Sequence, residues 1–226
     1  MPREVLAAMD PYGDFAKEHL LNPVILRMLG DVSGKRVLDA GCGHGYLSRL
    51  LAARGAEVVG VEPGDSLLDY AVEMEARQPH GIRYVKEDLS KLSDLGRFDA
   101  VVASMVFGCI PDWRPAMSKC VDALGPDGMF VFTLNHPCFE DLRTAWLEHG
   151  SFVTSTYLHE YEIVAPYGPD FHRPLSDYIN HVLASGCKLV ELSEPGLDPA
   201  AAASAPEDVE AYVHLPNFVI VEARRE

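Results

Sequence analysis

Short runs of β-branched and other apolar residues alternate along the chain with longer segments whose apolar residues recur at helical spacing. This alternation is typical of parallel strands joined by crossover helices, because parallel neighbours need a long connection. We therefore predict an α/β fold built on a doubly wound sheet. The expected strands are residues 35–40, 57–62, 82–85, 98–104, 129–134, 188–192 and 218–223.

Helices are predicted where apolar residues repeat every three or four positions. Glycine follows three of these segments, and we expect Gly55, Gly125 and Gly186 to form C-terminal caps. The opening segment, residues 14–29, is also amphipathic and is predicted to lie on the core or across a site. The expected helices are residues 14–29, 47–54, 65–77, 113–124 and 174–185.

Two segments depart from the alternation. Residues 138–172 are rich in aromatic side chains, which indicates either a cap over a binding site or additional core. Residues 196–208, GLDPAAAASAPED, have a low-complexity composition, and we predict a mobile surface loop there. A single domain, residues 1–226, is accordingly divided into an N-terminal helical lid (1–34), a central core (35–136), a cap insertion (137–173) and a C-terminal helix with a strand pair (174–226).

The composition indicates one globular domain. The chain has 226 residues, of which 34 are acidic and 19 basic, so its formal charge is −15. With 48% hydrophobic residues and a mean hydropathy of 0.00, it can bury a sizeable core. The negative charge disfavours nucleic acid and anionic membranes as partners through long-range repulsion. We expect a small-molecule partner, and a monomer or homodimer.

The sequence also bears on the compartment. No apolar run approaches the roughly 18 residues that a membrane helix needs, and residues 1–10 have no apolar core behind a basic start. The five cysteines form no CxxC pair, so we expect them to be reduced. The nine histidines show no metal-ligand spacing, and no metal is predicted. Together these features predict a cytoplasmic protein.

A glycine-rich turn after the first strand carries the strongest chemical signal. Asp39-Ala40-Gly41-Cys42-Gly43-His44-Gly45 lies between a strand and a helix, where a ligand approaches the backbone closely and only glycine leaves room. Glu62 ends the second strand 21 positions after Gly41, where an acidic side chain can accept from both ribose hydroxyls. Asp88 follows the third strand at the same edge. This arrangement predicts an adenosine-type ligand.

The spacing of the glycines argues against a dinucleotide. Dinucleotide sites favour Gly-x-Gly-x-x-Gly, with a pyrophosphate at the N-terminus of the helix. Here the third glycine comes one position earlier, and no Arg or Lys lies in the loop to meet a phosphate. A nicotinamide-dependent oxidoreductase is therefore disfavoured.

Four segments resemble the ordered motifs of the class I S-adenosylmethionine-dependent methyltransferases. VLDAGCGHGYLSRLLAARGAEVVGVEPG resembles the first motif and the ribose-binding acid of that family. KEDLSKL, FDAVVASMVFGCIPD and LGPDGMFVFTLN resemble, in order, its adenine-contacting acid, its fourth-strand motif and its Pro-Gly turn into strand five. The resemblance covers about residues 35–136. TLNHP is similar to a segment of the ubiquinone-type small-molecule O-methyltransferases, and HRPLSDYINHVLASG to the C-terminal part of many small bacterial members.

The resemblance implies a Rossmann-like seven-stranded sheet with a C-terminal antiparallel hairpin, an N-terminal helical lid and a substrate cap after strand five. It also implies S-adenosylmethionine as the cofactor, and it gives His44 no role. The implied contacts are Asp39, Gly41, Gly43 and Gly45 for the carboxypropyl and ribose region, Glu62 for the ribose hydroxyls, Asp88 with Leu89 for the adenine, the backbone of Ser104 and Met105 for the methionine ammonium, and Tyr12 as a lid residue.

Methyl transfer from a sulfonium needs alignment more than a nucleophilic side chain, because the leaving group is already good. Oriented proximity can supply on the order of 7–11 kcal/mol. For a phenol or alcohol acceptor a general base helps, and we predict His136, directly after strand five, for this role. The alternative is that His136 only shapes the pocket. His159 and His172 are lesser candidates.

The predicted activity is methyl transfer to an oxygen of a small, largely apolar acceptor, such as an aromatic or polyketide-like secondary metabolite. Two alternatives stay open. One is N-methylation of a small molecule, which needs no base. The other is an enzyme of the same fold, such as a cyclase, that binds the cofactor without transferring its methyl group.

Overall fold

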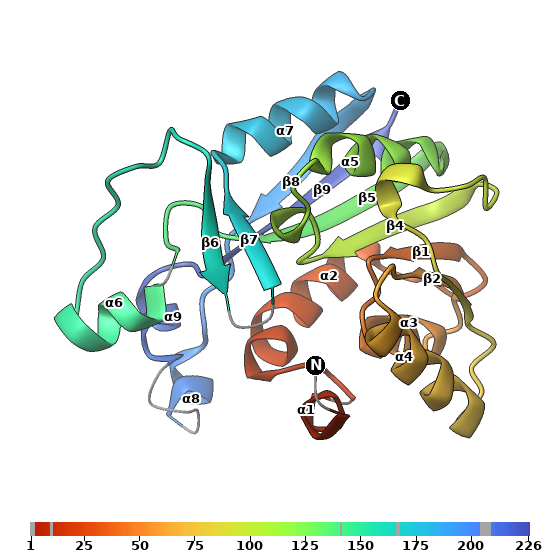
Figure 1. Cartoon of the computed structure of the whole chain (residues 1–226), viewed down its shortest axis with the longest axis horizontal. Coiled ribbons are helices and arrows are strands. Elements are labelled where there is room, and N and C mark those ends of the chain that lie inside the picture. Colours follow the sequence, from red (N-terminus) through yellow and green to blue (C-terminus); the bar gives the residue numbers. More distant parts are fainter. Residues whose placement is uncertain (1–2, 10, 141, 166–167, 204–208) are drawn as a thin grey trace.

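A seven-stranded sheet forms the centre of the molecule (Figure 1). The computed structural model describes residues 3–9, 11–140, 142–165, 168–203 and 209–226. The strand order is β3-β2-β1-β4-β5-β9-β8, in which β9 runs antiparallel to both of its neighbours and the other pairs are parallel. The strands are β1 Arg36–Ala40, β2 Glu57–Val61, β3 Arg83–Val85, β4 Phe98–Ser104, β5 Leu124–Asn135, β8 Cys187–Ser193 and β9 Phe218–Arg225. The predicted fold class is confirmed.

Helices cover both faces of this sheet, as a doubly wound fold requires. Helices α5 (Trp113–Asp122) and α7 (Leu175–Ala184) pack on one face, and α2 (Asn22–Leu29) and α3 (Tyr46–Ala52) pack on the other (Figure 1). The remaining helical segments are α1 Arg3–Ala8, η1 Lys17–Leu21, α4 Asp65–Arg77, η2 Leu89–Lys91, η3 Phe107–Cys109, α6 Leu142–His149, α8 Pro199–Ala202 and α9 Ala211–His214.

The N-terminal segment lies on the core. Its apolar stripe is buried through η1 and α2, where Leu21 and Ile25 are fully enclosed and pack with residues of α3 and β5. Of the two placements predicted for residues 14–29, the structure shows the one against the core.

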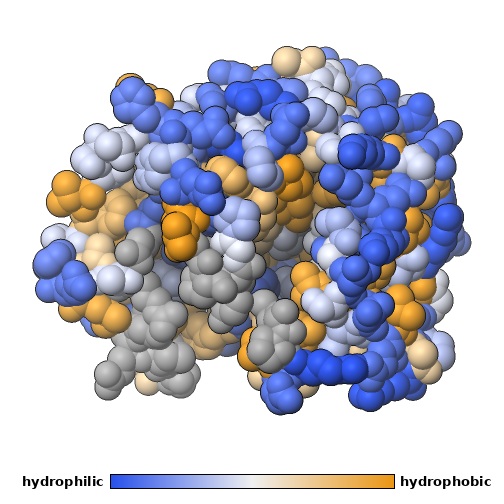
Figure 2. Space-filling model, in the orientation of Figure 1, coloured by the Kyte–Doolittle hydropathy of each residue, from blue (hydrophilic) through white to orange (hydrophobic). Residues whose placement is uncertain are grey.

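Hydrophilic side chains cover most of the face drawn in Figure 2, interrupted by scattered apolar ones. No helix in the described ranges is long and apolar enough to cross a membrane.

The cap after β5 consists of α6 and a separate hairpin, β6 (Tyr161–Ala165) with β7 (Gly168–His172). Phe139, Trp146 and Phe152 pack against the core, so for these three aromatic residues the core alternative holds. Tyr167 lies outside the described residues. The hairpin pairs with no other strand in the described part of the chain and lies beside η3.

Two local predictions are wrong. Gly125 does not cap α5, because that helix ends at Asp122 and Leu124 already pairs with Phe98 in the sheet. The predicted surface loop at 196–208 contains the short helix α8, which begins because the Asp198 carboxylate accepts from the Ala200 amide (2.7 Å) and proline follows it. Residues 204–208 lie outside the described ranges.

Leu197, in the segment predicted as a loop, is 4% exposed and belongs to the core under α9. We expect Leu197→Ala to lower the free energy of unfolding by about 2–3 kcal/mol, because it leaves a cavity. Leu192→Ala, at an exposed position on β8, is the control and should cost less than about 1 kcal/mol. Urea unfolding of both variants measures this, and equal losses would show that the segment does not dock on the core.

Candidate active site

The carboxyl ends of β1, β2 and β4 meet at one edge of the sheet, and the glycine turn crosses that edge. The amides of Gly41 and Cys42 donate to the Val61 carbonyl at 2.8 and 2.9 Å, which ties the turn to β2. Gly41, Gly43 and Gly45 have φ values of +75°, +55° and +82°. Side chains rarely adopt this left-handed conformation, so the backbone itself requires the glycines that the sequence places here.

The three glycines face different surroundings. A Cβ at Gly41 would lie 2.6 Å from Cγ2 of Val106, and one at Gly45 would overlap the hydroxyl of Tyr84. A Cβ at Gly43 would meet open space. Gly41 and Gly45 therefore let the turn pack closely, whereas Gly43 presents its backbone to the side from which a ligand can approach.

Glu62 directly follows β2 and is buried beside this turn. Its Oε2 accepts from the Gly43 amide at 3.1 Å, and its Oε1 accepts from the Gly64 amide at 2.8 Å. Burial raises the pKa of the Glu62 carboxyl, and the two amide hydrogen bonds oppose this rise. Each carboxylate oxygen has a further lone pair, so Glu62 can also accept from a pair of ligand hydroxyls.

Asp39 lies behind the turn and is 1% exposed. Its Oδ2 accepts from the Ser48 hydroxyl at 2.5 Å. Burial raises the pKa of Asp39 to about 6; the Ser48 hydrogen bond lowers it and the charge of Glu62 raises it further. The turn is thus supported by two carboxyl groups that are both held away from water.

Asp88 is exposed and caps η2. Its Oδ1 accepts from the amide and the hydroxyl of Ser90, both at 2.8 Å, and these hydrogen bonds lower the pKa of Asp88. Both bonds use the same oxygen, so Oδ2 can accept from another donor, such as the amine of an adenine. Leu89 beside it is buried.

Met105, directly after β4, has a φ of +60°, which is uncommon for a residue with a side chain. Its amide donates to the hydroxyl (3.0 Å) and the carbonyl (3.2 Å) of the buried Thr133 on β5, and these bonds hold the strained backbone. An ammonium group only donates hydrogen bonds. The carbonyls around Ser104 and Met105 are therefore the groups that can receive it, while the Met105 amide is already used.

Tyr12 is connected to the turn through its backbone. The buried Asn22 side chain donates to the Tyr12 carbonyl (2.7 Å) and accepts from the hydroxyl of Tyr46 (3.3 Å), the first residue of α3. The Tyr12 side chain itself is exposed. This link brings the N-terminal segment to the sheet edge where a lid would act, and the lid role stays a prediction.

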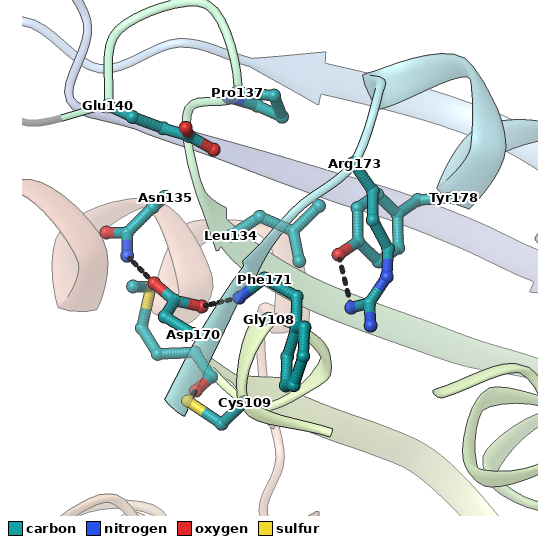
Figure 3. Close-up of a pocket in the computed structure, with 11 residues that line it drawn as sticks. Gly108, Cys109, Leu134, Asn135, Pro137, Glu140, Asp170, Phe171, Arg173 and Tyr178 are labelled. Atoms are coloured by element: carbon teal, nitrogen blue, oxygen red, sulfur yellow. Dashed lines mark hydrogen bonds between the residues drawn. The ribbon is translucent and has the colours of Figure 1, made fainter. Parts of the chain in front are cut away.

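A hollow of about 370 Å³, its open mouth included, lies at the carboxyl ends of β4 and β5. Figure 3 shows its walls, which come from the segment after β4, the end of β5, and β7 with the start of α7. Asp170 on β7 accepts from the Asn135 side chain and from the Phe171 amide, both at 3.0 Å. Gly108 leaves room for this carboxylate because it has no side chain. A Cβ at Gly108 would lie 2.5 Å from Oδ1 of Asp170.

His136 is buried at the end of β5, and both of its ring nitrogens are engaged. Nδ1 accepts from the Cys138 amide (3.1 Å), so the ring proton sits on Nε2, which faces Oε1 of Glu194 at 2.6 Å. Asn135 and Pro137 line the hollow, whereas His136 is not among its lining residues. The base role of His136 stays a prediction, and so does the alternative that it shapes the pocket.

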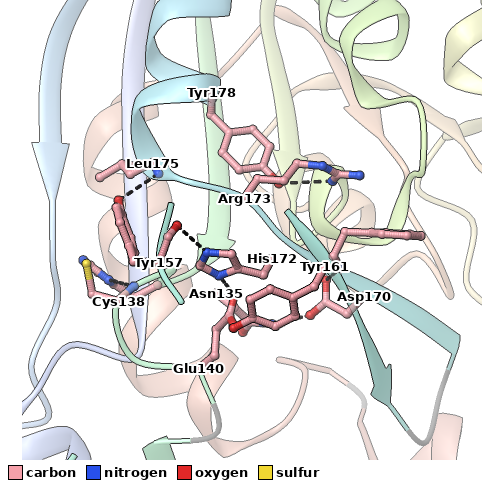
Figure 4. Close-up of polar contacts among 12 residues, drawn as sticks. Asn135, Cys138, Glu140, Tyr157, Tyr161, Asp170, His172, Arg173, Leu175 and Tyr178 are labelled. Carbon is pink, nitrogen blue, oxygen red and sulfur yellow. Dashed lines mark hydrogen bonds and ion pairs between the residues drawn. The ribbon is translucent and has the colours of Figure 1, made fainter. Parts of the chain in front are cut away.

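The other candidate histidines differ in burial. His172 is buried between Glu140 and the Tyr157 carbonyl (Figure 4). His159 is exposed. In the described part of the chain, no three His, Cys, Asp or Glu side chains gather in a way that could hold a metal ion.

Several pocket residues are missed by the sequence reasoning. Asn135 and Glu140 lie on either side of His136 in the sequence. Asn135 is also at the end of strand five, which is the reason that the sequence predicts His136 as a candidate. Asp170 and Arg173 come from the aromatic segment, where no motif identifies them. Their positions depend on the hairpin β6–β7, which was not predicted.

A family profile described as a methyltransferase domain matches residues 14–163. The chain belongs to the class I S-adenosylmethionine-dependent methyltransferases. Similar curated proteins include the ubiquinone biosynthesis O-methyltransferase of Coxiella burnetii, 36% identical over 131 residues, or 56% of each chain. This methyltransferase thus matches just over half the length of those relatives.

Solved structures agree. An S-adenosylmethionine-dependent methyltransferase from Mesorhizobium loti has a TM-score of 0.76 and 27% identity, covering 90% of this chain and 96% of that one. The magnesium protoporphyrin IX methyltransferase of Synechocystis, solved with bound SAH, has a TM-score of 0.66 at 17% identity, covering 99% and 94%, and shares the fold. The predicted family, fold and cofactor are thereby confirmed. The individual cofactor contacts stay predictions. The open space beside Gly43 and the unused lone pairs of Glu62 fit these predictions.

The raised pKa of Asp39 predicts how stability depends on pH. Between its ordinary pKa of 3.8 and the folded value of about 6, the folded state holds a proton that the unfolded state has lost. The contribution of Asp39 to the free energy of unfolding is therefore greatest below pH 4 and falls as the pH rises through 6. The fall amounts to about 3 kcal/mol, at 1.36 kcal/mol for each unit of difference between the two pKa values. We expect Asp39→Asn to remove this fall. Urea unfolding of both proteins from pH 4 to 7 tests it, and parallel curves would contradict it.

Proposed function

We propose that this methyltransferase transfers the methyl group of S-adenosylmethionine to an oxygen of a small organic acceptor, which binds in the hollow beneath the hairpin β6–β7. The observation that carries this proposal is that the loop after β4 borders both the hollow and the glycine turn. Met105 lines the hollow, while the next residue, Val106, packs against Gly41 of the glycine turn. The acceptor hollow and the predicted cofactor site therefore share one short segment.

The lining of the hollow supports an organic acceptor. Leu134, Phe171 and Tyr178 give it apolar and aromatic walls. Oxygen is favoured as the methylated atom because the Coxiella burnetii relative named above is an O-methyltransferase.

When bound, the cofactor supplies a methyl group on a positively charged sulfur that needs no further activation. The residues of this chain then have to bind and orient. Glu62 holds the ribose hydroxyls, Asp88 the adenine amine, and the carbonyls near Met105 the ammonium. The walls of the hollow exclude water and hold the acceptor oxygen in line, an alignment that can lower the barrier by on the order of 7–11 kcal/mol.

We expect Glu62→Ala to weaken binding of S-adenosylmethionine and S-adenosylhomocysteine at least tenfold, about 1.4 kcal/mol, because the ribose loses its acceptor. Glu57→Ala, at an exposed position at the start of β2, is the matched control and should bind as the unaltered protein does. Isothermal titration measures both. Failure of the unaltered protein to bind either ligand would refute the methyltransferase proposal.

Transfer itself is tested with methyl-labelled S-adenosylmethionine and a panel of phenols, alcohols and amines. Label in an ether product supports O-methylation. Label only in amines would make the protein an N-methyltransferase. Cofactor binding without any labelled product across the panel would favour a cofactor-binding enzyme that transfers no methyl group.

His136→Ala separates a base from a pocket-shaping residue. Because both ring nitrogens are already hydrogen-bonded, we expect the variant to lose about 1–3 kcal/mol of stability, with cofactor affinity and the pH profile of transfer retained. Thermal melts and transfer rates from pH 5.5 to 8.5 measure this. A rate loss of 100-fold or more together with loss of the acidic limb would instead establish His136 as the base.

A further inference from the structure

Three charged side chains line the acceptor hollow: Glu140, Asp170 and Arg173. They come from the segment after β5 and from β7 with the residue that follows it (Figure 4). Which of these charges remains available to a bound molecule depends on the partners that each side chain has within the protein.

The charge of Arg173 is fully used. Its side chain is buried, and each of its five N–H groups has an acceptor. The acceptors are Oε1 of Glu160 (2.6 Å), the carbonyls of Phe107 (3.1 Å), Ile110 (3.1 Å) and Pro111 (2.9 Å), and the hydroxyl of Tyr178 (3.3 Å). Arg173 therefore pairs with Glu160 and holds the loop before α5, and it offers no donor to a ligand.

The charge of Glu140 is also cancelled. His172 donates from Nε2 to the Tyr157 carbonyl (2.7 Å), and its Nδ1 faces Oε1 of Glu140 at 2.6 Å. The proton between these two atoms leaves the pair with no net charge, whether the nitrogen or the oxygen carries it. The second oxygen of Glu140 accepts from the Tyr161 hydroxyl (2.8 Å).

Asp170 differs from both. Its two hydrogen-bond donors, the Asn135 side chain and the Phe171 amide, are neutral. Among the described residues, no cationic side chain forms an ion pair with it. Each carboxylate oxygen keeps a further lone pair. The hollow therefore carries one uncompensated negative charge, in a protein whose formal charge is −15.

We propose that the hollow selects an acceptor that carries a protonated amine, and that the carboxylate of Asp170 pairs with this amine. The inference rests on the proposed function for the location of the acceptor and adds its chemical class. A charge-assisted hydrogen bond to an ammonium is stronger than one between neutral groups. Anionic acceptors are repelled.

The test compares three probes that share a phenol and differ in charge: tyramine, 4-ethylphenol and 4-hydroxyphenylacetate. Their dissociation constants are measured by NMR titration of the protein saturated with S-adenosylhomocysteine, and again without it. We expect tyramine to bind at least tenfold more tightly than 4-hydroxyphenylacetate. Asp170→Asn should reduce this ratio below twofold.

Asp94→Asn is the matched control. Asp94 is an exposed carboxylate before the start of β4, at the opposite edge of the sheet, so this variant removes the same unit of charge far from the hollow and should keep the tenfold ratio. Raising NaCl from 20 to 500 mM should weaken tyramine binding to the unaltered protein at least threefold and leave 4-ethylphenol unchanged. This salt test does not depend on whether Asp170→Asn folds.

Equal affinities for the three probes, a preference for tyramine that survives in Asp170→Asn, or no binding of any probe at 10 mM would each overturn the inference. Failure to bind S-adenosylhomocysteine counts against the proposed function instead. The two failures are distinguishable, because the charge preference is also measured without that ligand.

Discussion

Two carboxyl groups held out of water beside one glycine turn are the constraint on which the active-site end of the sheet depends. A buried carboxyl is costly unless donors surround it, and here the donors are the Ser48 hydroxyl for Asp39 and the amides of Gly43 and Gly64 for Glu62. The bonds that solvate Glu62 also fix the path of the turn. The parallel register makes this possible, because it sets Ala40 level with Val61 and so brings both carboxyl groups to one edge.

The cap is joined to the sheet by a different kind of interaction. Its hairpin shares no strand pairing with the sheet in the described part of the chain. Arg173 attaches it to the carbonyls of the loop between β4 and α5, and Asp170 attaches it to Asn135 of β5. Such networks are directional and specify a single arrangement. The strands that carry the glycine turn are therefore held by backbone pairing, whereas the hairpin β6–β7 is held on the sheet by side-chain hydrogen bonds.

This difference explains what could be predicted from the sequence. The strands and the glycine turn follow from local patterns, since alternation and left-handed φ values are properties of a few neighbouring residues. Asp170 meets Asn135 across 35 positions and Arg173 meets Phe107 across 66, and no local pattern encodes such contacts. His136 was placed correctly at the strand end, but its partner Glu194 lies 58 positions away. The helix at Pro199 departs from the predicted loop because the Asp198 cap and the proline that follows it start a helix within a low-complexity composition.

Gly108 is a point at which the segment after β4 meets the hairpin β6–β7. It has no side chain, and the carboxylate of Asp170 occupies the space that a Cβ would need. A side chain there would displace this carboxylate and so change the polar wall of the hollow. One position after β4 thus determines where the Asp170 carboxylate lies, although it belongs to neither the hairpin nor the glycine turn.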